Sequence, residues 1–393
     1  LPILPLDGGR IFSAALHLWL PEQTAWLICR VWSLFAVTCL LAFALAALLM
    51  APAGAEDFRP LLKSQPLTAG DSISDWLAVA AGRAGVQRAD YLRDLEDYVT
   101  SMYREQGGLD RIKATEWHRI ALAVLAQGGD PTAFGRDGDG QPVNLIADGT
   151  YHWTRSRSLG VQGLNGWIFA LITVDSAGFD VPEDALYTRA DMIAAILAGQ
   201  TEEGGFGLSS GSTDVDITAM ALQALAPYRD SADAYGGVTV PEAIRRGLEW
   251  LSRQQTENGD FISWDDPNAE STAQVLIALC SLGVDPETDP RFQKGGVTVL
   301  DGLRRYETAD GRFQHVLGGG GDMMATEQAI LALQALDRLR SGRGRLYDLR
   351  DIPKTQPAGT AAPVIIIAAG GAAVVIAAAA IIVWRKRTRT CTK

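Results

Sequence analysis

The sequence predicts an all-α protein built from repeated pairs of helices. A short polar loop that runs into an apolar helix occurs three times, and its threonine falls at Thr218, Thr272 and Thr326, so each step is 54 residues. Periods of this size are typical of repeat arrays, in which each unit buries its apolar face against its neighbours. Two further apolar helices align on the same Ala-Leu pairs, with Trp167 and His118 at the threonine position, and a looser sixth begins near residue 75.

Amphipathic helices alternate with the apolar ones. Between residues 241 and 255, Ile244, Leu248 and Leu251 recur at the i, i+4, i+7 spacing of a helix that buries one face. The apolar helices end in glycine-and-proline segments, such as 283–286, where glycine permits a left-handed residue and proline blocks continuation. Each unit is therefore an outer amphipathic helix, a turn and an inner apolar helix.

Two apolar segments flank the repeats. Residues 31–51 and 361–384 are 21 and 24 residues without a charge, long enough to span about 30 Å of hydrocarbon. The chain then divides into a membrane-proximal segment 1–30, a transmembrane helix 31–51, a linker 52–70, a repeat domain 71–350, a linker 351–360, a transmembrane helix 361–384 and a basic tail 385–393. Positive charge is enriched on the cytoplasmic side of membranes, so we expect a cytoplasmic tail and a repeat domain outside the cytoplasm, at the cell membrane. In the alternative interpretation, residues 30–55 are a cleaved signal peptide, which also exports the domain.

The charge balance excludes one class of partner. The net charge is −11, and the last nine residues carry five basic side chains, so the rest of the chain is near −16. Nucleic-acid binding needs a basic footprint for the phosphates, and we expect no nucleic acid as a partner.

A second marker lies between the helices of each pair. It reads Gln-x-x-x-Gly-x-Phe at 200–206 and 255–261, with a weaker copy at 307–313. These segments resemble the QW motifs of squalene cyclases and protein prenyltransferase β subunits. The resemblance implies an α/α toroid of about six helix pairs around a central cavity, over residues 71–350. Transcobalamin and intrinsic factor share that toroid and bind cobalamin with it, and residues 324–328 with 346–348 resemble bacterial surface-anchored members of the class.

The segment 214–219 resembles the Asp-x-Asp-Asp-Thr-Ala motif of class II terpene cyclases. The resemblance implies that Asp216 is a general acid that protonates an alkene, with Asp214 beside it. Ile217 takes the place of the family's last aspartate, which removes one carboxylate from the acid site. Such an acid must be kept protonated by burial and like-charge neighbours. The alternative is structural, because Asp214 lies four residues before the repeat threonine, where an aspartate caps a helix.

Several residues fall where a ligand in the toroid would bind. We assign ligand binding to Trp117, Asn165, Trp167, Phe206, Trp264 and Glu270. The alternative for the aromatic residues is the ordinary core. Acidic residues Asp216, Glu270 and Glu327 near the N-terminal ends of the inner helices oppose a diphosphate, which leaves a neutral or cationic ligand.

The first twelve residues contain Leu-Asp7-Gly, which resembles a motif of the site-2 protease family. There the aspartate is a zinc ligand that supports a His-Glu-x-x-His pair, and this sequence lacks the pair. One carboxylate cannot hold zinc, which takes about four ligands, so we expect no metal and no cofactor unless that pair lies upstream. Residues 1–50 would then be the end of a membrane metalloprotease; otherwise Asp7 caps an interfacial helix.

Three functions follow from these observations. The leading hypothesis is a membrane-anchored, extracytoplasmic toroid that binds a small apolar or amphipathic ligand, such as a terpenoid or a cobalamin-like molecule. The second is a terpene cyclase or mutase with Asp216 as general acid. The third is a structural or cell-surface contact module. The sequence leaves the identity of the ligand and the oligomeric state open.

Overall fold

The computed structural model describes residues 57–263 and 265–354. The chain divides into two compact units, residues 1–60 and 61–393, and the predicted repeats lie in the second. Both predicted transmembrane segments, the protease-like residues 1–50 and Asp7 lie outside the described part. Within that part, no helix is both long enough and apolar enough to cross a membrane.

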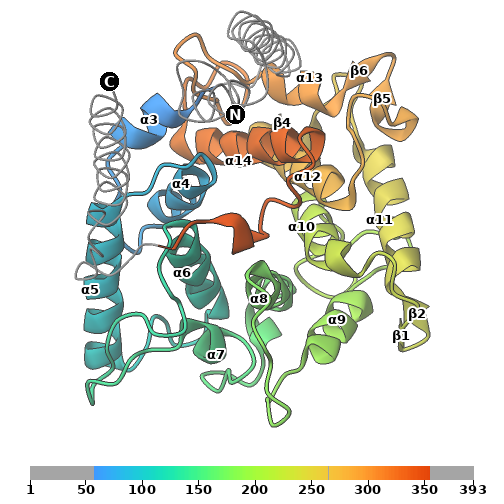
Figure 1. Ribbon diagram of the computed structural model, residues 1–393. Helices are drawn as coiled ribbons and strands as arrows, with labels where there is room; N and C mark the ends of the chain where they lie inside the picture. The colour runs from blue at the N-terminus through green and yellow to red at the C-terminus, as the bar shows by residue number, and fades with distance from the viewer. Residues whose placement is uncertain (1–56, 264, 355–393) are drawn as a thin grey trace, which may run out of the picture. The chain divides into compact units, whose positions relative to one another are not determined.

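Six helices form an inner ring in the described part of the second unit (Figure 1). They are α4 (Ser72–Arg83), α6 (Ala114–Ala126), α8 (Asn165–Ser176), α10 (Val215–Leu225), α12 (Ala269–Leu282) and α14 (Met323–Arg340). Each packs against the next in the series, and α14 packs against α4, so the ring is closed. The predicted α/α toroid is confirmed.

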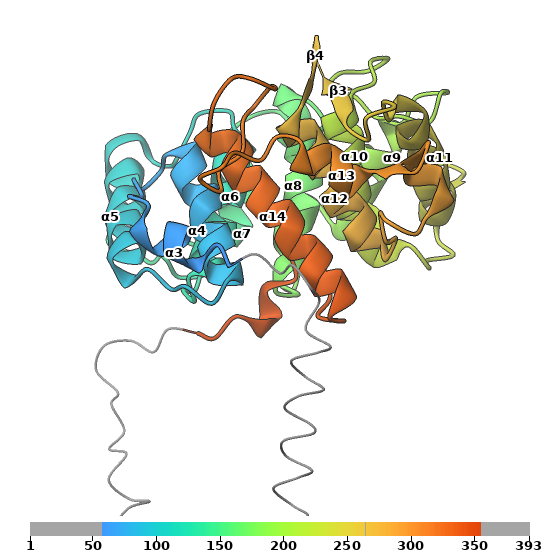
Figure 2. The same cartoon turned by 90° about the horizontal axis from the view of Figure 1, so that it is seen from above.

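The outer helices cover this ring, as Figures 1 and 2 show. They are α5 (Ala89–Gln106), α7 (Leu145–Gly149), α9 (Arg189–Ala198), α11 (Val240–Gln254) and α13 (Val299–Arg304). On α11 the predicted face is buried, with Leu251 fully enclosed, while Arg245 and Glu249 form an exposed ion pair of 2.8 Å. One outer face and one buried face explain why these helices are amphipathic, whereas the inner helices are packed on several sides and are apolar nearly all round.

The repeat threonine has a structural task in each unit. The hydroxyl oxygens of Thr218, Thr272 and Thr326 accept the backbone N–H of the motif phenylalanine at 2.8, 3.2 and 2.9 Å. The phenylalanines, Phe206, Phe261 and Phe313, are fully buried. A buried N–H must be paired, so the threonine fixes the start of the inner helix to the turn before it.

The glutamine and glycine of the same motif close the turn on its other side. The side-chain amide of Gln255 donates to the carbonyl oxygens of Gly259 and Phe292 at 3.3 and 3.1 Å. Gly259 has φ of 85°, and a Cβ there would lie 2.2 Å from the carbonyl oxygen of Thr298. Only glycine suits both the left-handed backbone and the close approach of α13.

Three short hairpins depart from the all-α prediction. They are β1 (Ala234–Tyr235) with β2 (Val238–Thr239), β3 (Phe261–Ser263) with β4 (Asp266–Asn268), and β5 (Gln293–Lys294) with β6 (Val297–Thr298), all antiparallel. The first and third turn at glycine pairs, 236–237 and 295–296, with φ from 60° to 89°. Two consecutive left-handed residues are what a tight hairpin turn requires, so these glycines form hairpins where helix connections were expected.

Short helices complete the described chain. A short α3 (Arg59–Ser64) lies within the predicted linker 52–70, which is therefore partly helical. Four turns of 3₁₀ helix are η1 (Leu159–Gln162), η2 (Ala226–Tyr228), η3 (Pro290–Phe292) and η4 (Leu349–Asp351).

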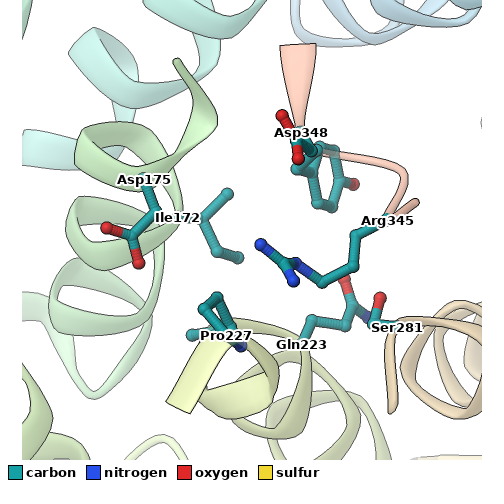
Figure 3. Close-up of a pocket in the computed structure, with 9 residues that line it drawn as sticks. Ile172, Asp175, Gln223, Pro227, Ser281, Arg345 and Asp348 are labelled. Carbon is teal, nitrogen blue, oxygen red and sulfur yellow. The ribbon is translucent and has the colours of Figure 1, made fainter. Parts of the chain in front are cut away.

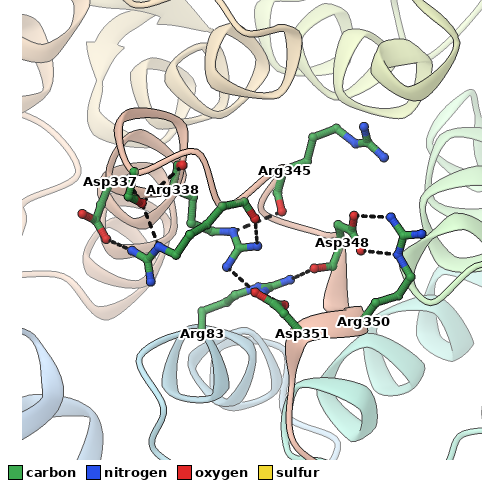
Figure 4. Close-up of polar contacts among 9 residues, drawn as sticks. Arg83, Asp337, Arg338, Arg345, Asp348, Arg350 and Asp351 are labelled. Carbon is green, nitrogen blue, oxygen red and sulfur yellow. Dashed lines mark hydrogen bonds and ion pairs between the residues drawn. The ribbon is translucent and has the colours of Figure 1, made fainter. Parts of the chain in front are cut away.

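Residues 341–352, which we call the C-terminal strap, follow α14 and cross the ring (Figure 1). Asp351 accepts hydrogen bonds from Arg83 at 2.7 Å and from Arg338 at 2.9 Å, as Figure 4 shows. The two arginine side chains are only 1% and 6% exposed. Arg83 also donates to the carbonyl oxygen of Asp348. The strap is thus tied to the first and last inner helices, and the domain extends past the predicted boundary at residue 350.

Candidate functional site

A cavity of about 350 Å³ lies inside the ring, toward the N-terminal ends of the inner helices. All six inner helices contribute to its lining, which comprises Ser72, Ile73, Trp76, Thr115, Glu116, Arg119, Asn165, Phe169, Met220, Gln274, Met324, Glu327, Gln328, Leu331 and Tyr347. Six of these residues belong to the first helical turns, so the cavity reaches that end of the ring. Its volume is in the range of cavities that enclose small molecules.

Tyr347 of the strap forms the base of the cavity. It also lines a smaller cavity of about 20 Å³, together with Asp175, Gln223, Ser281 and Arg345. Figure 3 shows the Arg345 side chain reaching into that smaller space between α8 and α10. Burial raises the pKa of Tyr347, and the Glu327 carboxylate raises it further, so the phenol stays protonated. The strap therefore separates the central cavity from the C-terminal ends of the inner helices.

Three aromatic rings form one wall. Trp76 lies 5.8 Å from Phe169 and 6.1 Å from Tyr347, centroid to centroid, with interplanar angles of 53° and 58°. The rings come from α4, α8 and the strap. None of the three was predicted as a ligand contact, because they come from three separate segments of the sequence and Tyr347 was noted only for a family resemblance.

Glu327 is the most unusual group in the lining. Its residue is 2% exposed, and its Oε2 has no hydrogen-bond partner among the described residues. Burial raises the pKa of this carboxyl well above its ordinary value, and the nearby Glu270 carboxylate adds to the effect. One signal was readable in the sequence, since the preceding repeats have Ala219 and Ala273 directly after the threonine where this repeat has Glu327.

Arg119 is the single cation among the described residues that line the cavity. Its guanidinium donates to Asp75 at 2.8 Å and to Glu116 at 2.7 Å. Asp75 is fully buried and also accepts the hydroxyl of Tyr91 at 2.6 Å. Two carboxylates already compensate the guanidinium, so this arginine offers no free positive charge to an anionic ligand.

Asp214 has the capping role that the alternative interpretation gave it. Its carboxylate accepts the backbone N–H of Ile217 at 2.9 Å at the start of α10, and the hydroxyl of Ser263 at 3.1 Å. Asn268 and Asp322 cap α12 and α14 in the same way. Any catalytic part played by Asp214 stays a prediction.

Asp216 lies in the first turn of α10, half-buried, near Ser263 and Ser271. Its Oδ1 has no hydrogen-bond partner. Burial raises the pKa of Asp216 to about 6, and the charges of Asp214 and Glu270 raise it too. This is the electrostatic setting that a general acid needs, although Asp216 is not among the residues that line the cavity. Its catalytic role stays a prediction.

The predicted ligand-binding residues scatter. Asn165 lines the central cavity and a neighbouring one of about 180 Å³. Trp117 is fully buried, donates to the hydroxyl of Tyr103 at 2.7 Å and stacks edge-on against Trp153, so it belongs to the core.

The other predicted ligand contacts lie elsewhere in the domain. Phe206 is part of the buried turn described above, and Trp167 packs against Tyr187 at 5.1 Å. Glu270 holds the exposed His315 at 2.8 Å. None of these three lines the central cavity, and Trp264 lies outside the described residues. The core alternative therefore holds for Trp117 and Phe206.

Exposed apolar side chains gather before the inner helices. Of the large apolar side chains exposed in the described part, five precede or begin α6, α10, α12 or α14, and we call them the apolar rim. They are Ile112, Leu208, Ile262, Leu317 and Met324, each 46–48% exposed. Met324 also lines the cavity, so apolar surface continues from the rim into it.

No group of three or more histidine, cysteine, aspartate or glutamate side chains in the described ranges is arranged to hold a metal ion.

Comparison with known proteins gives three likenesses. Residues 158–261 and 236–352 match the model of the prenyltransferase alpha-alpha toroid domain. Drimenyl diphosphate synthase of Streptantibioticus cattleyicolor is 25% identical over 294 residues, covering 70% of this chain and 53% of the synthase. The chain thus spans about half the length of this curated relative. A Candida albicans protein geranylgeranyltransferase-I, solved with GGPP, aligns at a TM-score of 0.46 and 11% identity, covering 72% of this chain and 90% of that one.

Proposed function

The chain belongs to the prenyltransferase α/α-toroid superfamily, and we propose that it binds a small apolar or amphipathic ligand in its central cavity. The observation that carries the proposal is the cavity itself, about 350 Å³ inside the ring and closed at its base by Tyr347. Aromatic and aliphatic side chains with a few polar groups are the usual lining of small-molecule sites. The apolar rim supports the entry of a ligand with an apolar part.

The charges disfavour a ligand with a free diphosphate at this position. Helix N-termini attract anions, and six of them surround the cavity. Against this, Glu116 and Glu327 line the cavity, and Arg119, the only cation among the described lining residues, is already paired with two carboxylates. The relative named drimenyl diphosphate synthase matches this chain over about half its own length, so its product gives no assignment here.

We also propose that the toroid stands outside the cytoplasm, anchored by residues 31–51 and 361–384. The support is the length of these uncharged segments and the basic residues 385–393. Both segments and the basic residues lie outside the part of the chain that the structure describes.

A second candidate function is a terpene cyclase with Asp216 as general acid. The observation in its favour is a half-buried carboxyl with an unpaired Oδ1 and a pKa raised to about 6. Asp216 would give its proton to an alkene carbon of a polyene, and loss of a proton from carbon would end the ring closure, without a change in mass. Asp216→Asn should abolish turnover and leave ligand binding in place. Turnover that survives this substitution would exclude Asp216 as the acid.

Native mass spectrometry tests the binding proposal. The purified chain is incubated with a lipid extract, next to Met220→Trp, which fills the cavity, and Leu186→Trp, which adds the same bulk at a site 53% exposed. We expect a retained ligand mass in the wild type and in Leu186→Trp, and its loss in Met220→Trp. No retained mass in a folded wild type, or equal retention by Met220→Trp, would contradict ligand binding and favour a contact module.

A further inference from the structure

Glu327 has no partner, in the part of the chain that the structure describes, that explains its position. Its residue is 2% exposed, its Oε2 accepts no hydrogen bond, and it lines the central cavity. A buried carboxylate without a counter-charge is costly, and buried polar groups in native proteins are nearly always paired. A buried, unpaired acid in a cavity is therefore a candidate for contact with a ligand.

The elements around Glu327 supply acids and a phenol, and no free cation among the described residues. Glu270 on α12 already holds His315, and Tyr347 on the strap is a protonated phenol. On α6, Arg119 is compensated by Asp75 and Glu116. The described groups around the cavity therefore give it an excess of acidic over basic side chains, which favours a positive ligand.

The aromatic wall belongs to the same cavity. Trp76, Phe169 and Tyr347 are all half-buried and line it, with Trp76 next to each of the other two rings. Glu327 lines the same cavity as these three rings, so one ligand can contact both the acid and this wall. The faces of aromatic rings carry partial negative charge and attract organic cations, tryptophan most strongly.

We propose that the cavity binds the head of an amphiphilic organic cation, a quaternary or tertiary ammonium, with Glu327 as its counter-charge and Trp76, Phe169 and Tyr347 as the surrounding ring faces. The inference rests on the proposed function and names the class of its ligand. The only bond change is loss of the Glu327 carboxyl proton to a solvent base as the cation enters, and the resulting carboxylate forms an ion pair with the cation. The apolar chain of the ligand then extends along Met220 toward Met324 and the apolar rim.

Three ligands that share a hexyl chain and differ only in their head group test this proposal. They are hexyltrimethylammonium, hexan-1-ol and hexyl sulfate, titrated into the full chain by calorimetry at fixed ionic strength. The proteins are the wild type, Glu327→Gln, Met220→Trp, and Glu242→Gln as a charge-matched control on the exposed face of α11. We expect the wild type and Glu242→Gln to bind the ammonium about tenfold or more tighter than the alcohol, and the sulfate most weakly.

In Glu327→Gln, the preference for the ammonium over the alcohol should shrink to what the ring faces alone provide, while the alcohol keeps its wild-type affinity and so shows that the variant is folded. Titrations in two buffers of different ionisation enthalpy should show proton release with the ammonium and none with the alcohol. Equal affinity for ammonium and alcohol in the wild type, or a preference in Glu327→Gln as large as in the wild type, would overturn this inference alone. If neither the ammonium nor the alcohol bound a folded wild type, or if Met220→Trp bound them as tightly as the wild type does, the proposed function would be overturned as well.

Discussion

Replacing Glu327 with glutamine changes how the stability of the toroid depends on pH. The substitution removes one acid and nearly keeps the shape of the side chain. The wild-type carboxyl is 2% exposed and unpaired at Oε2, and burial raises its pKa well above its ordinary value of 4.5. The folded chain therefore holds this proton more tightly than the unfolded chain does.

The sign and size of the effect follow from proton linkage. The stability that comes from the raised pKa is fully present below pH 4.5, the ordinary value. It is lost as the pH rises through the folded-state pKa of Glu327. Within that window the free energy of unfolding falls by about 1.4 kcal/mol per pH unit, because the folded state binds one more proton. Glu327→Gln has no such loss, so its stability relative to the wild type should grow by that amount per pH unit.

Urea denaturation at half-unit pH steps from 4.5 to 8 measures this difference. The comparison of interest is between Glu327→Gln and the wild type, with the exposed Glu242→Gln as control, so that the titration of other groups cancels. The control should keep a constant offset from the wild type. A constant offset for Glu327→Gln as well would refute the reasoning, because it would mean that folding leaves the pKa of Glu327 unchanged.

Three further predictions follow from the described contacts. Burial raises the pKa of Asp216 to about 6, so the free energy of unfolding of the wild type should fall by at most about 3 kcal/mol between pH 4 and 6 because of this group, and that fall should be absent in Asp216→Asn; the same pH dependence in urea denaturation of both proteins would contradict this. Thr272→Val leaves the buried N–H of Phe261 unpaired and should lower the free energy of unfolding by about 1–3 kcal/mol, whereas the exposed Thr288→Val should change it little. Asp351→Asn takes the counter-charge from the buried Arg83 and Arg338, so it should destabilise the chain by about 1–3 kcal/mol and speed proteolysis within the strap; wild-type cleavage would show that the strap is held by other contacts.

The closed ring was predictable because each unit repeats the same local requirement. The threonine that accepts a phenylalanine N–H must recur wherever an inner helix follows a motif turn, and this gives the 54-residue step at Thr218, Thr272 and Thr326. All three hairpins were missed, although the glycine pairs of the first and the third were readable in the sequence. The helix-pair pattern predicts plain loops at these two connections, whereas the backbone closes each of them as a hairpin with two left-handed glycines.

The candidate site was less predictable, because the fold assembles it from separate segments, of which 346–348 were noted only for a family resemblance. The aromatic residues beside the motifs, such as Trp117 and Phe206, serve the core, whereas Trp76, Phe169 and Tyr347 meet only when the ring closes. The strap gives no local signal either, since Asp351 and Arg83 are 268 residues apart. Among the predicted contacts, Asn165 lines the cavity, because it opens an inner helix at the cavity's level.

The most direct test of ligand binding in the central cavity is a crystal structure of the chain grown with the tightest binder of the three hexyl ligands. The proposed function predicts ligand density inside the ring, enclosed by Trp76, Phe169 and Tyr347, with the head group beside Glu327. Density for the ligand only at other places, with the cavity empty at a saturating ligand concentration, would contradict it.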